Sequence, residues 1–119
     1  MRQRSVQAYL HDILQACDLL TEFARDRDFE SYVADAMLRS AVERQFEIIG
    51  EALSQALAVD PGLQGRISQA RRIVSFRNRL THGYAFVSDQ MVWSILETDL
   101  PVLRREAAEL LEDVDRPPD

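Results

Sequence analysis

The chain has 119 residues, 46% of them hydrophobic, and a formal net charge of −6 at pH 7. This length fits one compact domain, and the hydrophobic share argues against an intrinsically disordered chain. Its single cysteine excludes an internal disulfide, and one cysteine with two histidines is too small a set for a zinc site. The acidic balance alone disfavours nucleic-acid binding, so the distribution of charge along the chain has to be considered.

Apolar residues recur at spacings of three and four between residues 5 and 25, which is typical of an amphipathic helix. The charged sequence RDRDFES predicts a connection, and a second, longer helix is expected over residues 30–58. This helix has two neighbouring apolar stripes, and we expect it to lie at the centre of a bundle or to bury its extra width between two copies of the chain. The stripes are Val33, Met37, Ala41, Ile48, Ala52 and Ala56 in one row, and Ala34, Leu38, Val42, Phe46, Ile49, Leu53 and Leu57 in the other.

The sequence DPGLQG ends the long helix, because Pro and Gly interrupt regular structure. A third helix is predicted over residues 63–82, and Gly83 is well placed as the left-handed residue that closes it. Ser88 favours the start of a last helical region over residues 89–114, in which Pro101 predicts a kink or a break.

The predicted fold class is therefore all-α, an antiparallel bundle of four to five helices. One domain is expected over residues 1–115, followed by a frayed tail at 116–119. No apolar run approaches the length of a membrane span, and polar residues interrupt the N-terminal apolar positions, which argues against a signal peptide. We expect a cytoplasmic protein with no membrane partner.

Positive charge is concentrated in one segment of the chain. Residues 61–88 contain five arginines and no Asp or Glu, whereas the rest contains nine arginines against twenty acids. The chain has no lysine, and guanidinium groups suit bidentate phosphate contacts, although genomic base composition alone can also produce an all-arginine chain. The five arginines are Arg66, Arg71, Arg72, Arg77 and Arg79.

The sequence RNRLTHGY, residues 77–84, carries the candidate site. Asn78 and His82 are four residues apart and share a helix face, whereas Arg77 and His82 lie about 140° apart around an ideal helix. Arg77 and His82 converge on one substrate only if the helix unwinds at Gly83, or if a second copy completes the site across a two-fold axis. The simplest alternative is that these side chains only cap the last carbonyls of the helix.

A histidine beside an arginine suits phosphodiester chemistry. His82 can move a proton on the attacking or leaving oxygen, while Arg77 stabilises charge on the non-bridging oxygens. On RNA the neighbouring 2′-hydroxyl can be the nucleophile, so neither a metal nor another cofactor is required. In the second helix, Glu47 and Glu51 either belong to a solvated face or orient one of the arginines.

RNRLTHGY resembles the R-x4-H-x-Y motif of the HepT-like toxins, a branch of the HEPN superfamily of small α-helical proteins. The sequences IIGEA at 48–52 and MVWSILETDLPVL at 91–103 resemble two further segments of the family, in the same order. The resemblance covers nearly the whole chain. One departure is Gly83, which stands where relatives often carry a longer side chain, frequently Glu. The motif positions are filled by Arg77, His82 and Tyr84, and Asn78 fits the polar residue that usually follows the arginine.

The resemblance implies a HEPN-like two-fold homodimer that acts as an endoribonuclease toxin of a bacterial toxin–antitoxin system. Arg77 and His82 would be its catalytic residues, facing their copies in the dimer cleft. It also implies a partner, a minimal nucleotidyltransferase antitoxin that neutralises the toxin by transferring AMP onto Tyr84. The residues expected to support the site are Asn78, Arg79, Glu51 and Glu47, and those expected to bind RNA are Arg66, Arg71 and Arg72.

Two other functions fit the same residues. The chain could be a non-catalytic helical partner and substrate of a nucleotidyltransferase, binding nucleotide or RNA without cleaving it. It could also be a purely structural helical dimer, in which Arg77 and His82 have no chemical role.

Overall fold

The computed structural model describes residues 4–83 and 87–115, and all the regular structure in these ranges is helical. The predicted all-α class is therefore confirmed, and no helix in the described ranges is both long and apolar enough to cross a membrane. The predicted tail at 116–119 lies outside the described residues. The elements are α1 (Val6–Ala24), α2 (Phe29–Ala34), α3 (Ala36–Val59), the 3-10 turn η1 (Pro61–Gly65), α4 (Ala70–His82), α5 (Asp89–Ser94), the π-helical segment η2 (Ile95–Asp99) and α6 (Leu100–Asp115).

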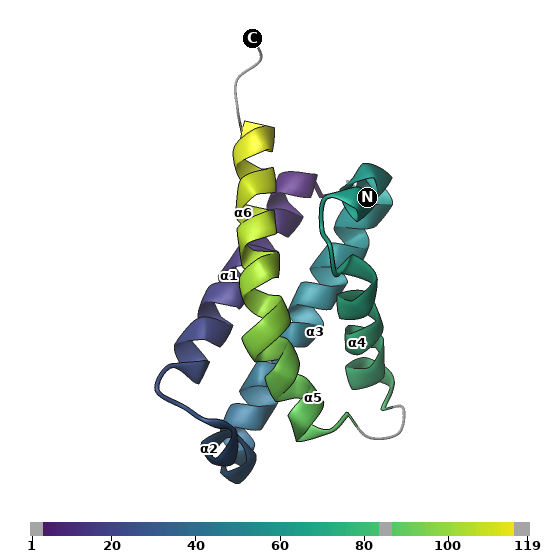
Figure 1. The fold of residues 1–119 in the computed structure, drawn as a ribbon. Helices are drawn as coiled ribbons and strands as arrows, with labels where there is room; N and C mark the ends of the chain where they lie inside the picture. Colours follow the sequence, from purple (N-terminus) through teal and green to yellow (C-terminus); the bar gives the residue numbers. More distant parts are fainter. Residues whose placement is uncertain (1–3, 84–86, 116–119) are drawn as a thin grey trace.

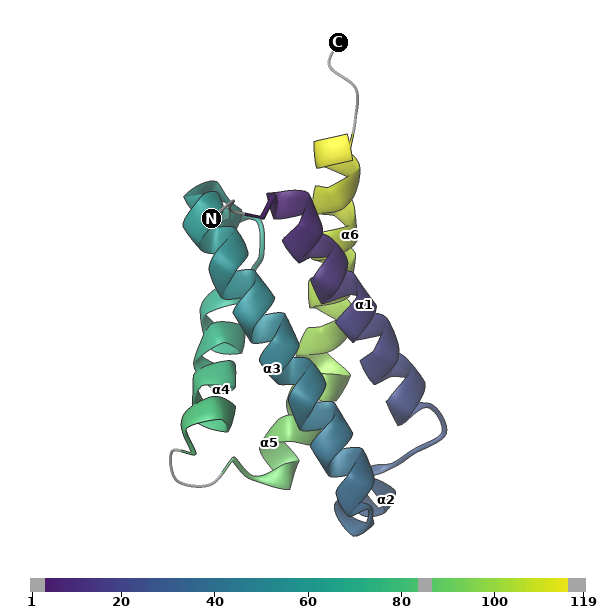
Figure 2. The ribbon, with the colours of Figure 1, turned by 180° about the vertical axis from the view of Figure 1, so that it is seen from behind.

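The long helices alternate in direction, so that α1, α3, α4 and the α5–α6 unit form an up-and-down bundle (Figure 1). Helix α3 lies between α1 and α4 and makes its most extensive contacts with these two helices, as Figure 2 shows from behind. Its central position, predicted from the double apolar stripe, is confirmed. The core also holds Cys17, whose burial raises the pKa of the thiol to about 12, so that it stays uncharged.

The prediction of one helix over residues 30–58 is wrong at its start, because the helix is interrupted at Asp35. The Asp35 carboxylate accepts a hydrogen bond from the Leu38 backbone N–H at 3.0 Å and begins α3, while Asp28 begins α2 through a capping box with Ser31. An aspartate competes with the helical backbone for its N–H groups, so it favours a helix start over a helix interior. These backbone N–H bonds stabilise the charged carboxylates and lower the pKa of both Asp28 and Asp35.

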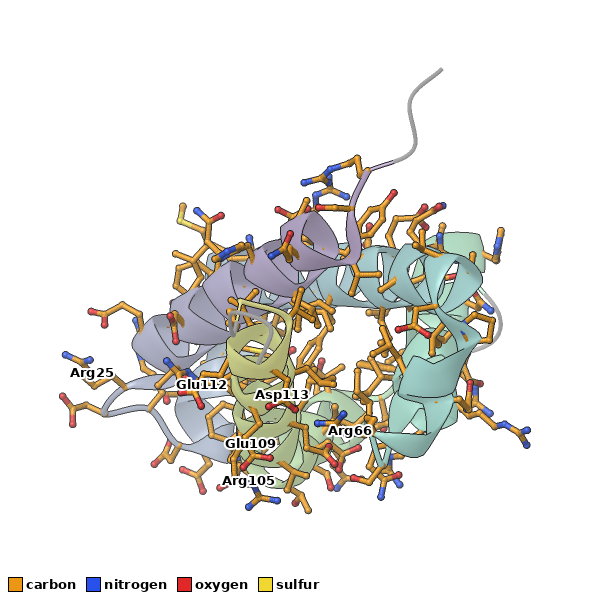
Figure 3. The ribbon with its side chains drawn as sticks, turned by 90° about the horizontal axis from the view of Figure 1, so that it is seen from above. Arg25, Arg66, Arg105, Glu109, Glu112 and Asp113 are labelled. Atoms are coloured by element: carbon orange, nitrogen blue, oxygen red, sulfur yellow. The ribbon has the colours of Figure 1, made fainter. Side chains whose placement is uncertain are left out.

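The third helix also begins later than predicted. The 3-10 turn η1 begins at Pro61, and α4 starts only at Ala70. Two acids of α6 hold the intervening residues: the Ser68 backbone N–H donates to the Glu106 carboxylate at 3.1 Å, and Arg66 Nη2 lies 2.6 Å from Asp113 Oδ2. Figure 3 shows Arg66 and Asp113 side by side at the top of the bundle. The late start thus depends on partners about forty residues away, which a local pattern cannot reveal.

The kink predicted at Pro101 takes the form of a π-helical segment immediately before it. A proline inside an α-helix removes one hydrogen bond and clashes with the carbonyl four residues back. Here the Leu100 N–H reaches back to the Ile95 carbonyl, five residues earlier, which widens the helix before the proline. The chain therefore continues from η2 into α6 without a break, and Asp99 is turned into the interior, where it is 7% exposed.

Candidate functional site

The candidate site begins where α4 crosses α3 at Gly50. A Cβ atom built on Gly50 would overlap the Cβ and Cγ atoms of Arg77, so the close approach of the two helices depends on the missing side chain. Glycine in the middle of a long helix is unfavourable, and a packing reason of this kind explains its presence. This contact places the stem of Arg77 directly on the central helix.

Two neighbours hold the Arg77 guanidinium. Its Nη2 forms an ion pair with the carboxylate of Glu51 in α3, and its Nη1 donates to Asn78 Oδ1 at 2.7 Å. The Arg77 side chain is 23% exposed and that of Glu51 is 48% exposed, so the pair lies at the edge of the helix interface and is reached by solvent. An arginine whose guanidinium is held by two partners keeps one orientation, which suits it to bind the oxygens of a phosphate group.

The structure distinguishes between the two candidate glutamates of α3. Glu51 contacts Arg77 of α4, whereas Glu47 lies 3.4 Å from Arg44 on its own helix. Only Glu51 is thus placed to orient an arginine of the third predicted helix. Glu51 also accepts a hydrogen bond from Gln55 at 3.1 Å, which further limits its rotamers.

His82 is the last residue of α4 and its side chain is exposed. Gly83 follows it with φ of 62°, the left-handed conformation predicted from sequence. The helix stays regular up to His82, so the unwinding that could have brought His82 toward Arg77 is not present within one chain. The two side chains therefore keep the separation of about 140° of an ideal helix. Tyr84, the third residue of the motif, lies outside the described residues.

The basic segment is less positive in the folded chain than its sequence indicates. Acids from other elements pair with three of its five arginines: Arg66 with Asp113 of α6, Arg72 with Asp99 of η2, and Arg77 with Glu51 of α3. Among the three arginines predicted to bind RNA, Arg71 is the one that has no described carboxylate within ion-pair distance. Arg79, which was predicted to support the site, has none either. Within the described part of residues 61–88, the positive charge without a carboxylate partner therefore lies at two exposed positions of α4.

Two contributors to this region escaped the sequence analysis. Asp99 is the buried acid that fixes Arg72, with its Oδ2 2.7 Å from Arg72 Nε, and its position depends on the π-helical segment. Met91 is the second, because its sulfur accepts a hydrogen bond from Arg79 at 3.9 Å. Gly50 did carry a signal, as a lone glycine in a long apolar helix. Within the described ranges, no group of three or more His, Cys, Asp or Glu side chains is arranged to hold a metal ion.

The fold and the site together define a small helical-bundle protein whose α4 presents an arginine, held by a carboxylate of the central helix, and a terminal histidine. Residues 13–110 match the family model described as "Ribonuclease HepT-like", and the chain belongs to this family. Its membership supports a ribonuclease function.

Curated relatives are similar over most of their length. The chain is 34% identical over 106 residues to "Putative RNase MJ1380" of Methanocaldococcus jannaschii. The aligned region covers 89% of this chain and 96% of that protein. It is 34% identical over 102 residues to "Probable ribonuclease HepT" of Thermococcus cleftensis, spanning 86% and 92% of the two chains. It is 29% identical over 109 residues to "Putative RNase TTE0752" of Caldanaerobacter subterraneus subsp. tengcongensis, spanning 92% and 96%. No solved structure matches the chain.

Proposed function

We propose that this protein is a metal-independent endoribonuclease, the toxin of a bacterial toxin–antitoxin system that acts in the cytoplasm. The observation that carries the proposal is the anchored arginine. Arg77 is held by Glu51 and Asn78 at the Gly50 crossing, on the same helix that ends in His82. The membership of the chain in the HepT-like ribonuclease family supports RNA as the substrate class.

In this mechanism the 2′-oxygen of the RNA forms a bond to phosphorus and the bond from phosphorus to the 5′-oxygen breaks. His82 moves a proton, either from the attacking 2′-hydroxyl or to the leaving 5′-oxygen. Arg77 binds the non-bridging oxygens and stabilises the charge that develops on them. Because the nucleophile belongs to the substrate, the reaction needs no metal-bound water.

The active form in this proposal is a two-fold dimer. The regular helix keeps Arg77 and His82 of one chain on different faces, and a second copy can supply the missing side chain to a shared cleft. The apolar surface left for a partner is smaller than the sequence analysis indicates, since Ala52 and Ala56 are buried within one chain. Val33 and Met37 remain exposed, at 39% and 82%.

We expect sedimentation equilibrium to give a dimer at micromolar protein concentration. Exposed apolar side chains gain free energy when they are buried against a second copy, and the divided active site requires one. A stable monomer at this concentration, in a sample that still cleaves RNA, would contradict the shared cleft.

The regulatory part of the proposal concerns Tyr84. A minimal nucleotidyltransferase antitoxin would transfer AMP from ATP: the tyrosine oxygen forms a bond to the α-phosphorus, pyrophosphate leaves, and the hydroxyl proton is released. The added phosphate brings negative charge and bulk close to the arginines of α4 and would compete with RNA. Tyr84 follows His82 by two residues in the chain, which supports an effect on the same site.

The experiment that tests the proposal is RNA cleavage by the purified protein in excess EDTA. We expect single-stranded RNA to be cut at a rate similar to that without EDTA, because no step uses a metal. An RNA in which 2′-deoxynucleotides replace the ribonucleotides should resist cleavage, since it lacks the nucleophile. Loss of cleavage in EDTA, restored by a divalent cation, would contradict the mechanism.

The second candidate, a non-catalytic partner that binds nucleotide or RNA, is favoured by one observation. Arg77 and His82 lie about 140° apart on a regular helix, so one chain alone does not bring the two candidate catalytic side chains together. Arg77→Lys separates the two candidates, because it keeps the charge and loses the bidentate fork. We expect RNA affinity within about threefold of wild type and a cleavage rate lower by about 10²-fold. Wild-type protein that binds RNA and never cuts it would favour the partner role.

A further inference from the structure

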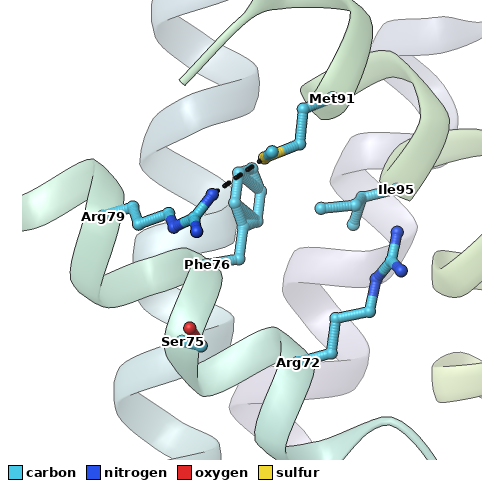
Figure 4. A pocket seen from close by; sticks show the side chains of 6 residues that line it. All are labelled: Arg72, Ser75, Phe76, Arg79, Met91 and Ile95. Carbon is cyan, nitrogen blue, oxygen red and sulfur yellow. Dashed lines mark hydrogen bonds between the residues drawn. The ribbon is translucent and has the colours of Figure 1, made fainter. Parts of the chain in front are cut away.

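A pocket of about 240 Å³ lies between α4 and the α5–η2 segment. Two guanidinium groups and a hydroxyl line its α4 side, and apolar side chains form its floor and far wall. Figure 4 shows Arg79 reaching toward Met91 and Arg72 reaching toward Ile95. The lining residues are Arg72, Ser75, Phe76, Arg79, Met91 and Ile95.

The two arginines of this pocket differ in their partners. Arg72 is fixed, because its Nε lies 2.7 Å from the carboxylate of Asp99, which is itself buried. Arg79 is held only by the sulfur of Met91 at 3.9 Å, and none of the described carboxylates is within ion-pair distance of it. A hydrogen bond to sulfur is weak, so Arg79 is free to exchange it for a phosphate oxygen.

The floor and size of the pocket indicate a flat, apolar group. Phe76 is 3% exposed and its ring packs edge-on against Phe46, with centroids 5.3 Å apart, so it forms a rigid floor. Pockets that enclose a whole ligand measure about 300–1,000 Å³. A smaller pocket suits one ring system of a larger ligand, the rest of which stays outside the pocket. An aromatic ring that carries a phosphate on a flexible link combines both requirements, and a nucleotide is such a group.

The π-helical segment η2 builds this pocket. It supplies Ile95 to the wall at its first residue and Asp99, the partner of Arg72, at its last. A π-helical segment is equivalent to an α-helix with one inserted residue. Without that residue, Ile95 and Asp99 would be rotated relative to each other around the helix axis by about 100°. Segments of this kind are rare and are frequently found at functional sites.

Ser75, which lines the pocket, and His82 share one face of α4. Ser75 and His82 are seven residues apart, which brings them within about 20° of each other around the helix and separates them by about 10 Å along it. A phosphodiester at His82 would therefore leave a neighbouring nucleotide beside the pocket. Single-stranded RNA is recognised in this way, through unstacked bases that lie against aromatic, apolar or guanidinium surfaces.

We propose that the pocket between α4 and η2 binds a nucleobase next to the scissile phosphate of single-stranded RNA, with Arg79 on the phosphate of that nucleotide. In this way the pocket sets the sequence preference of cleavage. This inference rests on the proposed ribonuclease function. Phe76, Met91 and Ile95 then determine which base is accepted, and Arg72 borders the ring.

The experiment measures binding independently of cleavage. The 119-residue chain is titrated with AMP, GMP, CMP and UMP, and with ribose 5-phosphate as the probe without a base. NMR follows the methyl signals of Met91 and Ile95. Ser75→Trp fills the pocket from an exposed position, and Ser94→Trp places the same side chain on an exposed position of α5 that does not line it. Circular dichroism checks that both variants keep the helical content of the wild type.

We expect at least one nucleotide to shift both methyl signals, with ribose 5-phosphate binding about 10-fold or more weakly. Ser75→Trp should weaken the binding of that nucleotide by about 10-fold or more. It should also change the preferred base beside the cleavage position in a randomised RNA. Ser94→Trp should leave both properties as in the wild type. If Ser75→Trp unfolds the chain, Arg79→Ala takes its place in the nucleotide titration.

The outcomes separate this inference from the proposed function. Nucleotides that leave the Met91 and Ile95 signals unchanged, or that bind no better than ribose 5-phosphate, overturn the pocket even if the protein cuts RNA. An unchanged base preference in folded Ser75→Trp overturns its role in specificity. A nucleotide that binds there in a protein that never cuts RNA supports the base site and overturns the ribonuclease proposal instead.

Discussion

His82→Ala is expected to lower the rate of RNA cleavage by about 10²- to 10⁴-fold while leaving RNA binding nearly unchanged. This range is what a positioned general acid or base contributes to a reaction. One histidine side chain contributes little to the attraction of a polyanion beside the arginines of α4, so the loss should be seen in the rate of the chemical step. Single-turnover cleavage of a labelled RNA at saturating protein concentration measures that step directly.

The chain has its own control for this substitution. His11 is the only other histidine, and it is exposed on α1. His11→Ala makes the same chemical change away from α4 and should cleave at the wild-type rate. Equal losses in the two variants, or equal activity of His82→Ala and wild type, would mean that His82 does not move the proton.

Local patterns were sufficient for the bundle and for some helix ends, although the capped starts at Asp28 and Asp35 were missed. The apolar spacing of α1, the left-handed Gly83 and the cap at Ser88, which accepts the Met91 N–H at 3.1 Å, are all confirmed. Two of the failures have a common physical cause. The start of α4 depends on residues far along the chain, and the burial of Asp99 depends on a change of helical pitch. Neither cause produces a recognisable spacing of apolar residues in the sequence.

The candidate site was predictable in its residues and not in its electrostatics. Sequence placed Arg77 and His82 on one helix and offered Glu51 as a partner, and the structure pairs Arg77 with Glu51. Five arginines without a local acid predicted a strongly basic surface. That surface is reduced because the paired acids come from α3, η2 and α6, and net charge along a segment cannot include acids that fold onto it. The catalytic roles themselves stay predictions.

Gly50→Ala is expected to destabilise the protein by about 1–3 kcal/mol, the usual cost of forcing extra volume into a packed interface. On an exposed helix the same change would stabilise by up to about 1 kcal/mol, because alanine is the better helix former. Here the new Cβ meets the Cβ and Cγ of Arg77, and a Cβ is fixed to the backbone, so no rotamer change relieves the overlap. Helix α4 has to move away from α3.

That movement should also reduce catalysis, because Arg77 is positioned from α3 by Glu51. A misplacement of about 1 Å can cost about 10²-fold in rate, so we expect the folded Gly50→Ala protein to lose RNA cleavage by up to this factor. Gly65→Ala is the matched control, since a Cβ there meets nothing within 4 Å. Urea denaturation should find Gly65→Ala within about 0.5 kcal/mol of wild type. If Gly50→Ala proves as stable and as active as Gly65→Ala, the two helices do not require a glycine at their crossing, and the anchoring of Arg77 on α3 is not what holds the site together.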